Sequence, residues 1–223
     1  MGYSWNWGVL FDSTGIGNET YLSWMLSGLG WLFLIGGIAW LIALTLGTVL
    51  GIMRTLPNKP LQTIASAYVS LFRNVPLLVQ LFIWYYVVPG FFPEGLRQWW
   101  YFGLAPNTSA MLSASVGLGL FTAARIAEQV RTGIQSLPQA FRVILPPMSS
   151  ELTNCFKNAS VASLVGVAEL ISQTKTIAEY TQNNFEIYTY ATLIYLVINL
   201  VLIMLMNFLE RKYRVPGLMA EGK

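Results

Sequence analysis

The stretch LSWMLSGLGWLFLIGGIAWLIALTLGTVLGIM, from Leu22 to Met53, contains no charged residue. A helix needs about 20 consecutive apolar residues to cross a bilayer, so this run is long enough to form a membrane span by itself. The rest of the chain has the same character. Hydrophobic residues make up 55% of the 223 and charged residues only 10%, whereas a typical soluble domain has about 25% charged residues. The sequence therefore predicts an integral membrane protein.

Four further apolar runs follow the first. The fourth span is the hardest to place, because its uninterrupted apolar part, Ala159–Ser172, has 14 residues and is too short to cross alone. Extending it back to Met148 gives enough length. The aromatic, Pro- and Gly-rich segment before the third span favours an interfacial loop with a short helix. We predict an all-α bundle of five transmembrane helices in one domain over 22–209, with spans at 22–53, 61–88, 108–127, 148–172 and 187–209.

The basic residues predict the orientation of these spans. Positive residues gather in cytoplasmic loops. With the amino terminus outside and the carboxyl terminus inside, only Arg97 and Lys175 lie outside. Residues 1–21 are then an external segment, 128–147 a cytoplasmic loop and 210–223 a cytoplasmic tail. The basic residues placed inside are Arg54, Lys59, Arg125, Arg131, Arg142, Arg211, Lys212, Arg214 and Lys223.

Several classes of activity are excluded or made improbable by what the sequence lacks. It has no His, which removes His-dependent catalytic triads and imidazole metal sites. It also has no G-x-x-x-x-G-K-[ST] loop for nucleotide phosphates, so any ATP and Mg²⁺ chemistry would belong to a partner subunit. The net charge of +3 is accounted for by membrane topology, and we expect membrane lipid rather than nucleic acid as a partner.

Polar residues inside apolar spans are the candidate functional residues, because such groups are costly in a bilayer. Each also has a structural alternative. Asn74 or Gln80 could cap a carbonyl freed at Pro76, Ser160 could bond to its own helix, and Lys157 could reach back to the cytoplasmic surface. A carboxylate at Glu169 should face a water-filled cavity or a cationic group. The candidates for a substrate pathway are Arg73, Asn74, Gln80, Lys157, Asn158, Ser160 and Glu169.

Three ordered motifs carry a resemblance to a known family. They are LFRNVPLLVQLF in the second span, TAARIAEQVRTGIQSLP at the end of the third, and LPQAFRVILPPMSSELTNCFKNASVASLVGVAEL leading into the fourth. The chain resembles the permease subunits of polar amino-acid ABC importers, particularly those for glutamate and aspartate. The resemblance covers nearly the whole chain. It implies a type I importer permease bundle in the bacterial inner membrane, with residues 1–21 in the periplasm.

The resemblance also implies partners and residue roles. Members of this family form a pseudo-symmetric permease pair, receive substrate from a periplasmic amino-acid-binding protein and rest on two ATPase subunits. The paired bundles work by alternating access. The Arg-Asn-x-Pro segment of the family falls on Arg73, Asn74 and Pro76, and its Lys-Asn-x-Ser segment on Lys157, Asn158 and Ser160. The residues that fall in its ATPase-coupling region are Glu128, Arg131, Gly133, Leu137, Pro138 and Arg142.

One part of the family pattern is missing. In the family, the loop after the third span holds a coupling helix, marked by Glu-Ala-Ala, then a Gly, and later Ile-x-Leu-Pro. Here the two flanks are fused through a single Leu137–Pro138 pair, and the core between them is absent. We therefore expect impaired coupling to ATP hydrolysis. The alternative is that the remaining VRTGIQSLPQAFRV forms a shorter coupling element.

Three hypotheses follow from these observations. The first is a subunit of an ATP-driven amino-acid importer, which is not itself an enzyme and binds no cofactor. The second is an assembled but transport-defective permease with the same fold. The third, an intramembrane enzyme, lacks support, because no span carries closely paired carboxylates and the chain has no His.

Overall fold

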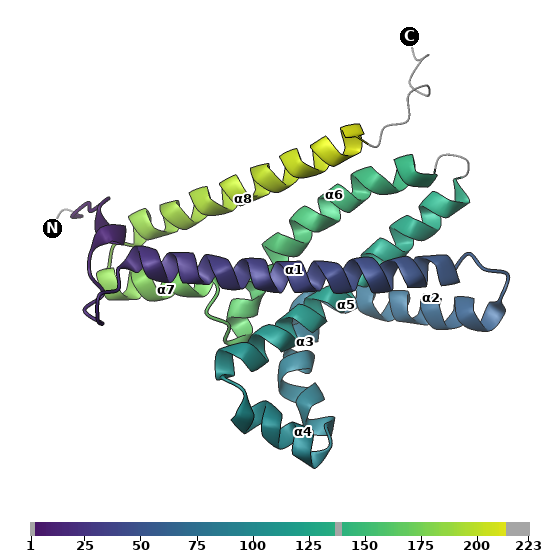
Figure 1. The fold of residues 1–223 in the computed structure, drawn as a ribbon, viewed down its shortest axis with the longest axis horizontal. Helices are drawn as coiled ribbons and strands as arrows, with labels where there is room; N and C mark the ends of the chain where they lie inside the picture. The colour runs from purple at the N-terminus through teal and green to yellow at the C-terminus, as the bar shows by residue number, and fades with distance from the viewer. Residues whose placement is uncertain (1–2, 137–139, 213–223) are drawn as a thin grey trace, which may run out of the picture.

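The structure is a computed structural model that describes residues 3–136 and 140–212. It is a bundle of helices (Figure 1), and the described residues contain no β-strand. The main helices are α1 (Tyr21–Met53), α2 (Lys59–Asn74), α3 (Leu77–Phe82), α4 (Glu94–Gln98), α5 (Pro106–Gln135), α6 (Ala140–Ala159), α7 (Leu170–Thr181) and α8 (Asn184–Lys212). Shorter helical turns are η1 (Val9–Phe11), η2 (Ile83–Val87), η3 (Val88–Phe91), η4 (Trp99–Gly103) and η5 (Ser160–Val165).

Helices α1 and α5 form the centre of the bundle and run parallel to each other. Small residues permit their close approach, as expected where tight packing drives helix association in lipid. A Cβ atom on Gly47 would lie 2.8 Å from the Ala123 carbonyl oxygen, and one on Gly51 would lie 2.6 Å from Val130 Cβ. A side chain at either glycine would therefore push the two helices apart.

The number of helices able to cross a membrane depends on two bent pairs. Three segments are long and apolar enough by themselves, namely Tyr21–Met53, Pro106–Gln135 and Asn184–Phe208. Two pairs reach the same length and apolarity together, and counting each pair as one span gives five. Lys59–Asn74 and Leu77–Phe91 meet at 105°, and Pro146–Val165 and Leu170–Thr181 meet at 54°.

The predicted span 61–88 corresponds to the first bent pair, whose two helices together have the length and apolarity of one span. The chain breaks at Pro76, where α2 ends and Val75 is extended, with φ −95° and ψ 127°. Proline disfavours the α conformation in the residue before it and supplies no N–H for the helix. Pro76 then becomes the N-cap of α3, which runs away from α1 and leads into α4 (Figure 1).

Most of the segment predicted as the cytoplasmic loop 128–147 is helical. Helix α5 continues to Gln135, and α6 begins at Ala140. The extension of α5 is held in place because Val130 and Gly133 are buried. Similarly, the predicted span 148–172 is divided, since α6 ends at Ala159 and Gly166 takes a left-handed conformation, with φ 89°, at the end of η5.

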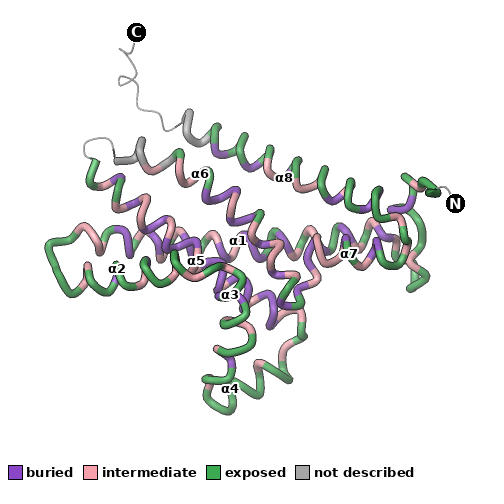
Figure 2. The backbone as a smooth tube through the Cα atoms, turned by 180° about the vertical axis from the view of Figure 1, so that it is seen from behind, coloured by how far each residue is buried: buried purple, intermediate pink, exposed green. Residues whose placement is uncertain are grey.

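The ends of the helices fall into two groups (Figures 1 and 2). One end of the bundle holds the α1–α2 turn, the α5–α6 connection and the carboxyl end of α8. The opposite end holds the amino-terminal segment and the α7–α8 turn. The segments at each end of the bundle are those that the basic residues predict to share one side of the membrane. Which end faces the cytoplasm stays a prediction.

The amino-terminal segment is attached to the start of α8. The Tyr3 hydroxyl and the Asn6 backbone N–H both donate to the Glu186 carboxylate, the latter at 2.7 Å. The Tyr190 hydroxyl donates to the Trp7 carbonyl. Glu186 is fully buried beneath this segment, so residues before α1 and residues of the last helix share one polar contact. We call it the Glu186 clasp.

Candidate functional site

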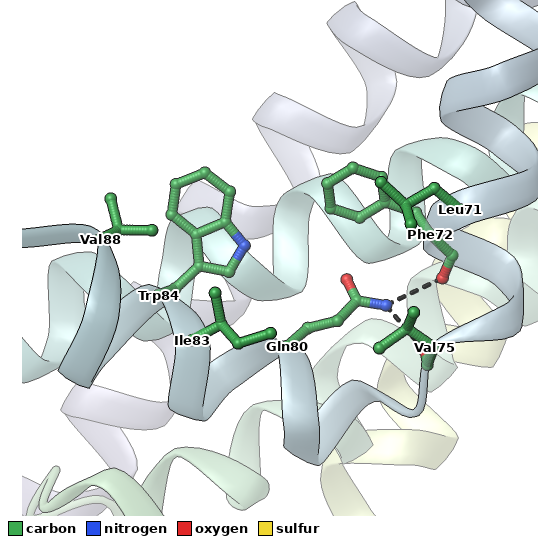
Figure 3. A pocket seen from close by; sticks show the side chains of 7 residues that line it. All are labelled: Leu71, Phe72, Val75, Gln80, Ile83, Trp84 and Val88. Atoms are coloured by element: carbon green, nitrogen blue, oxygen red, sulfur yellow. Dashed lines mark hydrogen bonds between the residues drawn. The ribbon is translucent and has the colours of Figure 1, made fainter. Parts of the chain in front are cut away.

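The break between α2 and α3 is stabilised by the side chain of Gln80 (Figure 3). Its amide Nε2 donates to the Phe72 carbonyl at 2.9 Å and to the Val75 carbonyl at 2.8 Å. Both carbonyls belong to the end of α2, where a helix leaves its last oxygen atoms without intrahelical partners. Capping was the structural alternative predicted for Gln80, and this is the arrangement observed. Asn74 instead donates to the Ser70 carbonyl, at 2.8 Å.

A cavity of about 170 Å³ lies inside this bend. The Gln80 Oε1 atom is buried and has no hydrogen-bond partner in the described part of the chain, and Figure 3 shows the amide among apolar side chains. A ligand in the cavity could therefore donate one hydrogen bond to Gln80 Oε1 and place an apolar group against the surrounding side chains. None of the described residues that line the cavity is cationic, so it is a poor site for a carboxylate. The side chains around Gln80 are Leu71, Phe72, Val75, Ile83, Trp84 and Val88.

Replacing Gln80 with Leu is expected to loosen this bend. The substitution leaves the Phe72 and Val75 carbonyls without their donor, and an unsatisfied buried polar group costs about 1–3 kcal/mol. We expect a lower unfolding temperature for detergent-purified protein. The matched control is Gln98→Leu, since that exposed amide makes only a 3.5 Å contact with Glu94. Equal unfolding temperatures for the two variants would contradict the capping role.

Four charged residues meet at the end of the bundle that holds the α5–α6 connection. The Glu128 carboxylate lies 2.6 Å from Arg54, 2.6 Å from Arg131 and 3.4 Å from Arg73. These residues come from α5, from α2, and from the residue that follows α1. We call them the Glu128 cluster. It joins Arg73, predicted for the substrate pathway, to Glu128 and Arg131, predicted for the coupling region, and it fastens three elements with one carboxylate.

Sequence reasoning missed the role of Arg54 in this cluster. Arg54 is 74 residues from Glu128 along the chain, and its only predicted role was as a marker of the cytoplasmic side. A second polar link was missed as well. Glu151 of α6 lies 3.5 Å from Arg125 and accepts a hydrogen bond from Gln129 at 3.3 Å. The polar character of the stretch around Glu151 was the available signal, but it did not identify the partners.

The Lys-Asn-x-Ser segment lies where α6 passes into η5. The Ser160 hydroxyl donates to the Lys157 carbonyl at 2.7 Å, which is the bond within its own chain segment that the structural alternative predicts. Lys157 is exposed and has no ion pair in the described part of the chain. Asn158 is partly exposed. The segment therefore leaves one cation without a charge partner.

Glu169 caps the first turn of α7. Its carboxylate accepts from the backbone N–H groups of Ile171, at 3.0 Å, and Ser172, at 2.9 Å, and from the Tyr195 hydroxyl at 3.3 Å. The residue is fully buried. Such capping satisfies N–H groups that a helix start leaves without partners. A part in the substrate pathway stays a prediction, and the carboxylate already has structural partners.

The remaining coupling-region residues lie around the α5–α6 connection. Gly133 is buried in α5. Leu137 and Pro138 lie outside the described residues, and Arg142 belongs to α6, although its side chain lies outside the described part.

Comparison with known proteins identifies the class. Residues 135–215 match the family described as "Binding-protein-dependent transport system inner membrane component". Over 97% of its length the chain is 40% identical to the glutamate/aspartate import permease protein GltJ of Escherichia coli (strain K12), of which 98% is covered. It is 29% identical to the probable glutamine ABC transporter permease protein GlnM of Bacillus subtilis, with 93% of this chain and 97% of the relative covered.

A solved structure gives the same result at the level of the fold. The crystal structure of an amino acid ABC transporter with histidines matches with a TM-score of 0.68 and 28% identity, covering 86% of this chain and 95% of that one. The fold and the relatives define the class as a membrane permease. The chain belongs to the family of amino-acid ABC transporter permeases, whose relatives are transport subunits and not enzymes.

The comparison with GltJ also bears on the length of this chain. The alignment extends over 241 positions, and this chain has 223 residues, so at least 18 positions (241 minus 223) have no counterpart here.

Proposed function

We propose that this chain is one permease of an ATP-driven importer for acidic amino acids, glutamate and aspartate. The observation that carries the proposal is the 40% identity to GltJ across nearly the whole of both chains. The chain would form a translocation pathway with a homologous partner permease in the bacterial inner membrane. A periplasmic binding protein would deliver the substrate, and two separate ATPase subunits would bind ATP and Mg²⁺ and drive alternating access.

The Glu128 cluster supplies the candidate cation for an acidic substrate. An anionic amino acid needs a positive group along its path. Arg73 is half exposed and is the most distant of the three arginines from Glu128. It also lies directly before the Pro76 break. These features support a substrate role for Arg73, while Arg54 and Arg131 serve mainly to hold the helices together.

Uptake measurements test the substrate. The chain would be reconstituted in vesicles with its partner permease, ATPase and binding protein, and uptake of labelled glutamate would be followed with excess unlabelled aspartate, glutamine or histidine. We expect aspartate to compete most strongly. Stronger competition by glutamine or histidine would assign the importer to a different amino-acid class and overturn the acidic-substrate proposal.

Glu169→Gln is expected to lower uptake more than Ser163→Ala. The Gln side chain is uncharged and has one acceptor oxygen, so it cannot replace both carboxylate oxygens that accept from Ile171 and Ser172. One hydrogen bond to a charged group contributes about 1.5–3 kcal/mol. A reduction of about tenfold follows if the cap positions the fourth span for transport. The Ser163 hydroxyl donates only to the Ser160 carbonyl close by, at 2.8 Å. Equal uptake by the two variants would rule out the role given to Glu169.

The shortened α5–α6 connection favours a second candidate function, a permease that assembles with its partners but transports poorly. Only residues 136–139 separate α5 from α6. The intramembrane-enzyme alternative is set aside, because the relatives that match are transport subunits.

A further inference from the structure

A polar groove lies between α6 and α8. It has a volume of about 460 Å³. The two helices lie side by side in Figures 1 and 2. The α6 residues recur every three or four positions, which places them on one face of the helix. The polar side chains that line the groove are Ser149, Ser150, Thr153, Asn154 and Lys157 of α6 and Asn207 of α8.

Among the described residues, the groove has an excess of hydrogen-bond donors and one positive charge without an ion pair. The side chains of Asn154, Lys157 and Asn207 have neither a hydrogen bond nor an ion pair to any part of the chain that the structure describes. Glu151, the nearby carboxylate on α6, is already paired with Arg125. An ammonium beside two free amides is suited to an anionic group with several acceptor oxygens.

The position of the groove indicates which anion it would meet. In the sequence, Asn207 lies three residues before the charged run Glu210, Arg211 and Lys212, which follows the apolar part of α8, so the groove opens at the level where a bilayer has its headgroups. A helical side chain points toward the amino terminus of its helix, which directs the Lys157 ammonium toward Asn154 and the groove opening. On α8, Leu200 and Met204 are 49% and 69% exposed. They provide apolar surface for acyl chains.

From these observations we infer that the α6–α8 groove binds the phosphate of an anionic phospholipid, with Lys157 as the pairing cation and Asn154 and Asn207 as hydrogen-bond donors. Basic pockets between membrane helices are known to hold such headgroups. The inference assigns Lys157 to lipid and not to the substrate carboxylate. It is independent of which amino acid is transported.

The test is lipid retention by the full-length chain. Protein is purified in detergent micelles containing equal amounts of phosphatidylglycerol and phosphatidylcholine, and bound lipid is counted by native mass spectrometry. We expect selective retention of phosphatidylglycerol. Lys157→Gln should reduce that retention about fivefold, since one basic residue contributes about 1 kcal/mol to binding an anionic lipid surface. Asn207→Leu, on the opposite wall, should also reduce it, and it serves as the second variant if Lys157→Gln fails to fold.

Lys175→Gln is the matched control, because it removes the same charge from an exposed pair with Glu179 at 3.8 Å. It should retain phosphatidylglycerol as the unmodified chain does. Equal losses for Lys157→Gln and Lys175→Gln would overturn the inference. Displacement of the lipid by inorganic phosphate would instead identify a free-anion site, and displacement by glutamate would return Lys157 to the substrate pathway. Either result would also overturn the lipid assignment.

Discussion

Insertion of a family coupling segment between Leu137 and Pro138 is expected to raise ATP-driven uptake from near background to a readily measured rate. The physical reason is that a rigid segment of this chain must reach the ATPase subunit for its movement to be transmitted to the bundle. A coupling helix of about three turns needs about 11 residues, and only 136–139 connect α5 to α6. Without a rigid element that projects from the bundle, closure of the ATPase subunits has little of this chain to act on.

The measurement is performed in two steps on the unmodified and restored chains, each expressed with the partner permease and the ATPase. Co-elution of the ATPase in detergent reports docking, and uptake into vesicles reports coupling. A third version, with a Gly/Ser insert of the same length, separates the effect of a rigid segment from that of added length. If the unmodified chain retains the ATPase and transports as well as the restored one, the short connection already couples.

Replacement of Glu128 by Ala is expected to give the largest loss of stability among single substitutions at the candidate site. The change removes the anion shared by three arginines. Breaking a fully buried pair costs about 3–5 kcal/mol, and exposed pairs contribute about 0–1 kcal/mol. The side chain of Glu128 is 26% exposed and that of Arg54 is 13% exposed, so we expect an intermediate loss, about 2 kcal/mol.

Thermal unfolding in detergent measures this loss, and Glu179→Ala provides its control. Glu179 forms a pair with Lys175 at 3.8 Å, with both side chains largely exposed, so its replacement should leave the unfolding temperature almost unchanged. A double change of Arg54 and Glu128 to Ala should recover part of the loss, because it removes the more buried of the two arginines that lie 2.6 Å from Glu128. Similar unfolding temperatures for the Glu128 and Glu179 variants would show that the cluster does not hold the helices together.

The parts of the fold that depend on local sequence could be predicted. The run from Leu22 to Met53 is apolar throughout, and the structure has a helix over almost the same residues. The position of the break at Pro76 was also predictable, because proline acts on the residues beside it. The 105° angle of that break could not be predicted. It is set by the packing of α3 against α5 and of α2 against α1 and α5, and no local sequence pattern indicates these contacts.

The candidate site shows the same division. Gln80 was found because an amide one turn after a proline can reach freed carbonyl groups, which are close in sequence. The partners of Glu128 were not found, because Arg54 and Arg73 come from distant segments. The helical extension of α5 was read as a loop for a related reason. Its polar residues favoured a solvent-exposed segment. The burial of Val130 and Gly133 depends on packing with other helices, such as the contact of Val130 with α1 at Gly51, which the sequence does not indicate.

The Glu186 clasp has a mechanical consequence for the bundle. It attaches the start of α8 to the residues that precede α1, whereas most of α8 contacts its neighbours over a narrow face and is exposed elsewhere (Figure 2). A helix fixed at one end moves as a lever, so a small rotation at the clasp displaces its far end the most. Rotation of this kind would widen or narrow the α6–α8 groove while the α1–α5 pair stays unchanged.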